Sequence, residues 1–184
     1  PQVCPSYDSA MALAEKEGHF HSQSCEDFAM FSDFYRSPMK CHGTFVELGA
    51  LDGNKLSNTW FFEHVLDWRG ILIEAQPGNS AKLVRNRPNA ATFQAAICDS
   101  SIRHVTFMGE EGEVGAVKGM TTFEHMGNYK LGFKKSFDVL CVPIGDLIKD
   151  TGLTHIDFFS LDVEGAEYDV LLTMDWTIPV HYLL

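Results

Sequence analysis

The chain is poor in basic residues, since its 184 residues include 14 Lys and Arg against 25 Asp and Glu, for a net charge of −11. Binding to a nucleic-acid backbone rewards clustered Lys and Arg, so this balance argues against a nucleic-acid partner. The few basic clusters, Arg85 with Arg87 and Lys134 with Lys135, are too sparse to change that, and we expect them on solvated faces. Long apolar runs are also missing, because no stretch approaches the ~20 residues that a membrane-spanning helix requires.

Paired cysteine motifs are absent as well. Five cysteines are scattered along the chain without any C-x-x-C pair, which argues against a zinc site and against a full disulfide framework. Cys98 and Cys141 lie in apolar, strand-like segments, and we expect buried thiols there. No metal site is predicted. A hydrophobic content of 45% is that of one globular domain with a real core, and the cytoplasm is the default expectation for its location.

The most informative stretch is a strand that ends in a glycine-rich turn. Thr44–Leu48 (TFVEL) is apolar enough for a buried strand, and Gly49 and Gly53 follow it before a helical pattern begins. Such a turn lets backbone N–H groups approach a ligand closely. Glu47 stands where the dinucleotide fingerprint needs its first glycine, and an acid suits a cationic ligand such as S-adenosylmethionine. Glu47, Gly49, Asp52 and Gly53 are therefore candidate cofactor-binding residues, with Glu47 expected to hold the ammonium group.

A second apolar strand, Gly70–Glu74 (GILIE), ends in a carboxylate twenty-one residues beyond Gly53. A nucleoside-binding βαβ unit places an acid at about that distance, ~20 residues, to hold the ribose hydroxyls. Between the two strands, Ser57 or Asn58 is expected to cap a helix. Glu74 is therefore the candidate ribose ligand, and the alternative is an ordinary strand-end carboxylate that faces water.

A third element is Ile156–Glu167 (IDFFSLDVEGAE). Asp157–Leu161 has the length of a strand, and Asp162 follows at its carboxyl end, where open α/β sheets place their ligand sites. Asp162 is thus the candidate catalytic residue. Glu164 and Glu167 enter the next helix, where carboxylates complement the helix dipole without any chemistry, so structural and functional roles both stay open for them.

The stretches FVELGALDG, SNT, LIEAQP and IDFFSLDVEGAEYDVL occur together and in order, and with them the chain resembles the FkbM-like family of S-adenosylmethionine-dependent methyltransferases. The resemblance implies a Rossmann-like methyltransferase fold, an α/β architecture with a mostly parallel sheet and helices on both faces. It also implies O-methylation, often of a hydroxyl on a sugar or small natural product. We expect residues 1–42 to form an N-terminal helical flank, and residues 43–184 to form the S-adenosylmethionine-binding domain.

Other segments are less specific. Ala91–Ile97 is expected to form a third strand, and Asp99 just follows it, where this fold usually contacts the adenine, so Asp99 is a further candidate cofactor-binding residue. Residues 109–137 are broken by many glycines, and a long loop of that kind is usually functional or disordered. His125 and Tyr129 are candidate substrate contacts in it, although a surface loop with no role is an equal alternative.

The end of the sequence carries its own expectation. Val180–Leu184 is predicted to open a further strand beside Phe158–Leu161, and the resemblance implies more strands beyond it. We therefore expect a C-terminally truncated sheet whose apolar edge is exposed unless an oligomer or a partner covers it. Such a chain is expected to bind the cofactor but to turn over poorly.

Methyl transfer to a hydroxyl needs position more than side-chain chemistry, because the cofactor carries the reactive group. Asp162 is expected either to position the sulfonium end or to remove the hydroxyl proton, and His104, His125 and His181 are weaker candidate bases. The predicted partner is a small-molecule or glycan acceptor. Two alternatives remain: a non-catalytic binding or scaffold protein that keeps the fold, and an NAD-linked oxidoreductase, which Glu47 disfavours.

Overall fold

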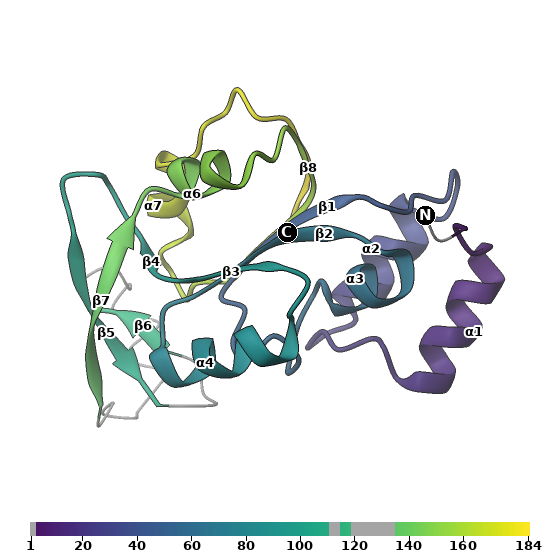
Figure 1. Ribbon diagram of the computed structural model, residues 1–184, viewed down its shortest axis with the longest axis horizontal. Coiled ribbons are helices and arrows are strands. Elements are labelled where there is room, and N and C mark those ends of the chain that lie inside the picture. Colours follow the sequence, from purple (N-terminus) through teal and green to yellow (C-terminus); the bar gives the residue numbers. More distant parts are fainter. Residues whose placement is uncertain (1–2, 111–114, 119–134) are drawn as a thin grey trace.

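The computed structural model describes residues 3–110, 115–118 and 135–184 (Figure 1). The helices are α1 (Tyr7–Glu17), α2 (Glu26–Phe34), α3 (Trp60–Leu66), α4 (Pro77–Asn86), α6 (Ile144–Thr151) and α7 (Glu167–Leu172). The strands are β1 (Thr44–Leu48), β2 (Arg69–Glu74), β3 (Ala91–Gln94), β4 (Ala96–Ile97), β5 (His104–Gly109), β6 (Gly115–Val117), β7 (Ser136–Val142), β8 (Ile156–Leu161) and β9 (Val180–Leu183).

The main sheet has the order β3-β2-β1-β8-β9, and every neighbouring pair in it is parallel. In the register of the three central strands, Leu48 of β1 lies opposite Ile73 of β2 and Leu161 of β8. The residues that follow these positions therefore meet at one edge of the sheet. This confirms the predicted α/β fold with a mostly parallel sheet.

Helices cover both faces of this sheet, as predicted. Phe45 of β1 belongs to one core cluster and its neighbour Val46 to the other, because successive side chains of a strand point to opposite faces. The cluster around Phe45 takes in apolar residues of α1, α2, α3 and α4. The cluster around Val46 takes in residues of α6 and α7.

The predicted single strand Ala91–Ile97 is wrong, because the chain changes sheet within it. β3 pairs with β2 in the main sheet, whereas β4 pairs with β7 in a second sheet of order β4-β7-β5-β6. Ala95 lies between the two strands and is buried. A strand-like pattern carries no information on which partner strand a segment joins.

The N-terminal helices pack into the same core as β1 rather than standing apart. α1 begins after Ser6, whose hydroxyl accepts the Ser9 N–H at 3.2 Å, and ends at Gly18. Ala10 and Ala14 of α1 and Phe31 of α2 are buried in the cluster that contains Phe45. Figure 1 shows α1 at one end of the long axis, with β5, β6 and β7 at the other.

The cysteines differ from the expectation of buried thiols. Cys98 and Cys141 are buried, but they form a disulfide, and Cys4 pairs with Cys41 in a second one. The pairing of β4 with β7 places Ala96 opposite Cys141, which brings the Cα atoms of Cys98 and Cys141 to 5.7 Å. Only the sheet arrangement reveals this proximity, since the two residues are 43 positions apart. Cys25 is the free and exposed cysteine.

β9 lies where the sequence predicted it. It runs parallel to β8, with Val180 opposite Ile156 and Tyr182 opposite Phe158, and it forms the edge of the main sheet. Leu183 and Leu184 are about half exposed there. In the described part of the chain, no helix combines the length and apolar character needed to span a membrane.

Candidate functional site

A cavity opens at the carboxyl ends of β2, β1 and β8, which is where a parallel α/β sheet places its ligands. Its walls come from these strand ends, from the segment after β1, from the crossing between the two sheets, from β5 and β6, and from the segment before α2. The described lining residues are Gln23, Glu26, Glu47, Leu48, Gly49, Leu51, Leu56, Asn58, Ile73, Glu74, Ala75, Ala95, Ala96, Ile97, Phe107, Gly115, Val117, Ser160, Asp162, Val163, Glu164, Ala166 and Val170.

Gly49 is needed because two strand ends approach each other here. Its φ is 86°, and a Cβ at this position would lie 1.9 Å from the backbone oxygen of Asp162. The Asp162 N–H donates to Leu48 O at 3.1 Å, while Gly49 and Ala50 both donate to Ile73 O at 3.1 Å. The strand ends are thereby tied together, and Gly49 and Asp162 lie on the same edge of the sheet.

Glu74 closes β2 with a buried carboxylate, at 4% exposure. One oxygen accepts the Leu51 N–H at 2.9 Å and the other accepts the Gln76 N–H at 2.7 Å. Burial raises the pKa of Glu74 to about 7, although the backbone N–H groups act to lower it. A carboxyl group with this pKa changes its charge near neutrality, and Glu74 is one of the residues that line the cavity.

Glu47 is held by the segment that follows the glycine turn. Its carboxylate accepts hydrogen bonds from the Ser57 hydroxyl at 2.9 Å, the Asn58 N–H at 2.7 Å and the Thr59 hydroxyl at 2.6 Å. Burial raises the pKa of Glu47, and the Arg87 guanidinium and these hydrogen bonds oppose that shift. Glu47 lines the cavity as expected, but its oxygens are already engaged by the chain itself.

Arg87 lies behind Glu47 and is fully buried, which overturns the expectation of a solvated face. Its guanidinium contacts Glu63 at 2.6 Å and lies 3.9 Å from Glu47. It also donates to the hydroxyls of Ser57 and Thr59, each at 3.1 Å. The arginine is buried because two buried carboxylates need a cation beside them, a requirement that only the folded arrangement reveals.

The expected helix cap at Ser57 or Asn58 is not formed, since α3 begins at Trp60 and its N-cap Thr59 makes no side-chain cap. These residues are committed elsewhere. The Asn58 amide donates to the Ser160 hydroxyl at 2.8 Å, which links the turn after β1 to β8. Within the described part of the chain, the buried Asn58 Oδ1 has no hydrogen-bond partner, and Asn58 lines the cavity. A buried acceptor of this kind can take a hydrogen bond from a ligand in the cavity.

The loop after β8 is shaped by Glu167. One carboxylate oxygen of Glu167 accepts the N–H groups of Val163 at 3.3 Å and Gly165 at 3.1 Å. Glu167 therefore braces the loop that carries Asp162 and Glu164, and both of these line the cavity. Of the two roles that the sequence left open for Glu167, its hydrogen bonds support the structural one.

Four predicted site residues line the cavity together: Glu47, Gly49, Glu74 and Asp162. Three others do not line it: Asp52, Gly53 and Asp99. The Asp52 carboxylate accepts the Asn54 and Lys55 N–H groups and so shapes its own turn. Gly53, with φ of 78°, lets α4 approach, because a Cβ there would lie 2.5 Å from Leu83. Asp99 is exposed and accepts the Ser101 N–H.

The candidate histidine bases do not gather at the cavity. His104 is exposed on β5 and is not among the described lining residues. His181 contacts the Asp157 carboxylate at 2.8 Å, in β9 and near the start of β8, far from the carboxyl ends of the strands. His125 and Tyr129 lie outside the described residues. Among the described residues, no group of three or more His, Cys, Asp or Glu side chains could hold a metal ion.

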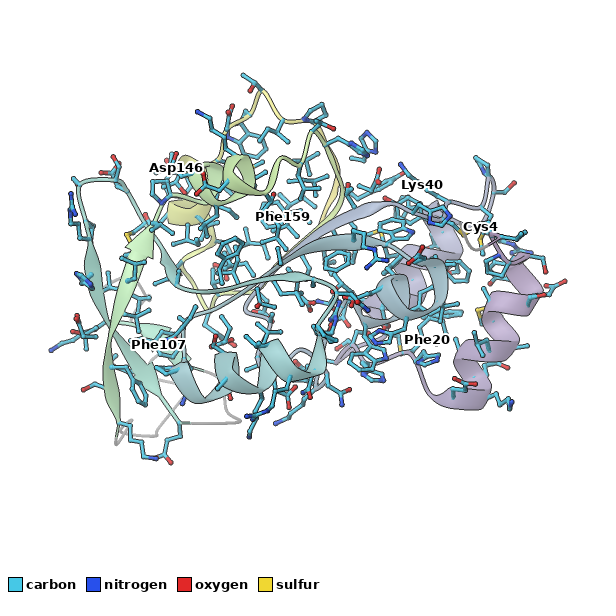
Figure 2. All side chains as sticks on the ribbon, in the orientation of Figure 1. Cys4, Phe20, Lys40, Phe107, Asp146 and Phe159 are labelled. Carbon is cyan, nitrogen blue, oxygen red and sulfur yellow. A yellow bond between two sulfur atoms is a disulfide. The ribbon has the colours of Figure 1, made fainter. Side chains whose placement is uncertain are left out.

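Several lining residues escaped the sequence-based reasoning. Phe107 and Val117 reach the cavity from the second sheet, and Figure 2 shows Phe107 at the opposite end of the molecule from Cys4. Gln23 comes from the segment before α2 and Glu26 from the first position of α2. Asn58 had the one usable signal, since it lies in the SNT stretch that contributed to the resemblance. For the others the sequence carries only ordinary apolar or surface patterns.

Comparison with known proteins agrees with this geometry. The model of the methyltransferase FkbM domain matches residues 47–182, most of the chain and every strand that contributes to the cavity apart from the start of β1. A comparison with curated proteins gives no match. Because the matched region contains Glu47, Gly49, Glu74 and Asp162, the predicted resemblance is confirmed. The chain belongs to the FkbM methyltransferase family.

Proposed function

We propose that this methyltransferase uses S-adenosylmethionine and transfers its methyl group to a hydroxyl of a small-molecule or glycan acceptor, within a Rossmann-like domain. The observation that carries the proposal is the convergence of Gly49, Glu74 and Asp162 on one cavity. Three strand ends there supply a close backbone approach, an acceptor for ribose hydroxyls and a carboxylate.

The donor set suits the charge of this cofactor. Four lining residues from the strand ends and the loop after β8 carry carboxyl groups (Glu47, Glu74, Asp162 and Glu164), and none of the described lining residues is Lys, Arg or His. A sulfonium and an ammonium group are favoured in such surroundings, whereas the pyrophosphate of NAD is disfavoured. The orphaned Asn58 Oδ1 offers one further acceptor for an ammonium N–H.

The chain's residues then divide the work of binding. Glu74 accepts hydrogen bonds from the ribose hydroxyls, and Gly49 lets the backbone come close to the methionine part. Glu47 acts mainly through residues 57–59, because their hydroxyl and N–H groups occupy its carboxylate and fix Asn58 beside Ser160. Apolar contacts from Phe107 and Val117 exclude water on the side of the second sheet.

When bound, the cofactor supplies an electrophilic methyl group on a sulfonium that leaves as a neutral thioether once the acceptor oxygen displaces it. Asp162 receives the hydroxyl proton as the new C–O bond forms, which keeps the count of protons and charges balanced. Its place in the cavity, at the tip of β8 and in backbone contact with Gly49, supports this role.

Calorimetric titration of the chain with S-adenosylmethionine, S-adenosylhomocysteine and NAD tests the cofactor assignment. The first two should bind and NAD should not, and binding of NAD alone would replace the proposal with an oxidoreductase. Incubation with cofactor carrying a ¹³C-labelled methyl group, followed by NMR of the product, tests the transfer. A labelled methyl ether supports O-methylation, a labelled N-methyl group refutes it, and binding without any transfer favours a scaffold protein.

A further inference from the structure

Two residues of the cavity wall lie outside the region that matches the family. Gln23 and Glu26 precede and begin α2, whereas the family match starts at residue 47. The remaining described lining residues all lie within the matched region. The matched region therefore provides most of the cavity, and a segment that precedes this region completes it.

Aromatic packing fixes the path of this segment. The Phe20 ring stacks on Phe61 of α3, with ring centroids 4.7 Å apart, and meets Phe28 of α2 edge-on at 5.4 Å. The His21 ring stacks on Trp60 at 4.7 Å, with 13° between the planes. Figure 2 shows Phe20 beside α3. The segment is thus anchored on the same helix that follows the cofactor turn.

Polar contacts hold the same residues from the other side. The fully buried Asp27 accepts the N–H groups of His21 at 2.7 Å and Ser22 at 3.1 Å, as well as the Ser22 hydroxyl at 2.5 Å. The His21 ring lies 3.0 Å from Asn54 O and 2.8 Å from Gly18 O. Because these contacts hold the segment in place without a ligand, positioning the backbone that carries Gln23 and Glu26 costs little on binding.

These two side chains differ in charge and in hydrogen bonding. Burial acts to raise the pKa of Glu26, but hydrogen bonds from Ser24, from its own backbone and from Ser22 outweigh it and leave this pKa below its ordinary value. Glu26 Oε2 accepts the Ser24 N–H at 2.7 Å. Glu26 is thus a carboxylate at neutral pH, and Gln23 adds an amide that can both donate and accept.

We propose that Gln23 and Glu26 form the acceptor-selecting wall of the cavity, which admits hydroxyl compounds that are uncharged or carry an ammonium group and rejects those that carry a carboxylate or phosphate. The inference rests on the proposed function, which puts the adenosine at Glu74 and the methyl group between Gly49 and Asp162, and it assigns the acceptor to the wall formed by Gln23 and Glu26. An anionic acceptor in this cavity would meet the Glu26 and Asp162 carboxylates, without a cationic side chain among the described lining residues.

The test uses the full chain saturated with S-adenosylhomocysteine and matched probes that differ only in charge. Glucosamine, glucose and glucuronate form one set, and 3-amino-1,2-propanediol, glycerol and glycerate form another. Saturation-transfer NMR at millimolar probe concentrations should rank the amine first, the neutral compound second and the carboxylate last in each set. If no probe binds, or if the affinities do not follow the charge of the probes, the proposed selection of acceptors by Gln23 and Glu26 is wrong.

Variants then assign the selection to the two residues. Glu26→Gln should weaken binding of the amine probe roughly tenfold, which corresponds to the loss of a hydrogen bond to a charged group. It should also reduce the difference in affinity between the amine probe and the carboxylate probe. Gln23→Ala should weaken the neutral probe while keeping the charge ranking. Glu15→Gln removes an exposed carboxylate of α1 outside the cavity lining and should change nothing. An unaltered ranking in Glu26→Gln would refute the assignment.

Calorimetry with S-adenosylhomocysteine separates this inference from the proposed function. All three variants should bind it as the unsubstituted chain does. If the unsubstituted chain fails to bind it, the proposed function fails. If it binds and the charge ranking is absent or indifferent to Glu26, only the acceptor-selecting wall fails.

Discussion

Glu74 should make cofactor binding depend on pH in a window centred near 7. Burial raises its pKa to about 7, and binding to ribose hydroxyls favours the ionised form, because a carboxylate accepts hydrogen bonds more strongly than a carboxylic acid does. If only the ionised form binds, the affinity for S-adenosylhomocysteine at pH 8 should exceed that at pH 6 by about tenfold. S-adenosylhomocysteine is the suitable probe, because it lacks the sulfonium charge.

The raised pKa of Glu74 should also affect the stability of the unliganded chain. Stability should fall as the pH rises, whereas the affinity for the cofactor should increase. A raised folded-state pKa contributes stability that is fully present below the unfolded value of 4.5 and is lost as the pH rises through about 7. The loss for this one group is of order 3 kcal/mol. Urea denaturation of the unliganded chain at pH 5 and at pH 8 would measure it.

The Glu74→Gln variant decides whether this reasoning holds. Glutamine keeps the side-chain volume and one carbonyl acceptor but cannot ionise. The variant should therefore lose about 1.5–3 kcal/mol of binding free energy for S-adenosylhomocysteine relative to the unsubstituted chain, and its affinity should not depend on pH in this window. Asp146 is an exposed residue of α6 (labelled in Figure 2) that is not among the described lining residues, and Asp146→Asn is the matched control. A tenfold pH effect that survives in Glu74→Gln would refute the ribose assignment.

Three further predictions concern the stability of the fold and its disulfides. Gly49→Ala places a Cβ against the Asp162 backbone oxygen at a positive φ, so thermal denaturation should show a loss of more than about 1 kcal/mol, and an unchanged melting temperature would contradict the close approach. Arg87→Met strips the cation from two buried carboxylates and should cost about 3–5 kcal/mol in urea denaturation, whereas Arg85→Met on the exposed side of α4 should cost almost nothing. Thiol titration of the unfolded, unreduced chain should detect Cys25 alone, and three or more thiols would contradict the two disulfides.

Much of the main sheet could be predicted from the sequence because its strands are short apolar runs with sharp ends. Thr44–Leu48 is both the predicted and the observed β1, and Glu74 ends β2 as expected. The interruption at Ala95 could not be predicted, since the residues of Ala91–Ile97 do not reveal that its two halves pair with strands of different sheets. The disulfide between Cys98 and Cys141 depends on that same long-range pairing.

The candidate site was predictable where one residue type does one job at a strand end. Gly49, Glu74 and Asp162 are of that kind, and they line the cavity together. The burial of Arg87 could not be predicted, because an arginine near a helix end looks the same in sequence whether it faces water or a buried carboxylate. Its partner Glu63 looks like an ordinary helix-surface acid until α3 and α4 are placed side by side.

Because the chain crosses from the main sheet to the second sheet at Ala95, ligand binding in the cavity is coupled to the packing of the two sheets. The cavity walls belong to two separately hydrogen-bonded sheets, with Ile73 and Glu74 on one and Phe107 and Val117 on the other. A ligand that touches both can bind only while the sheets are docked, so its binding free energy adds to the stability of that docking. Amide hydrogen exchange should therefore slow not only at the contact residues but also along β7, which pairs with both β4 and β5 and holds the second sheet together.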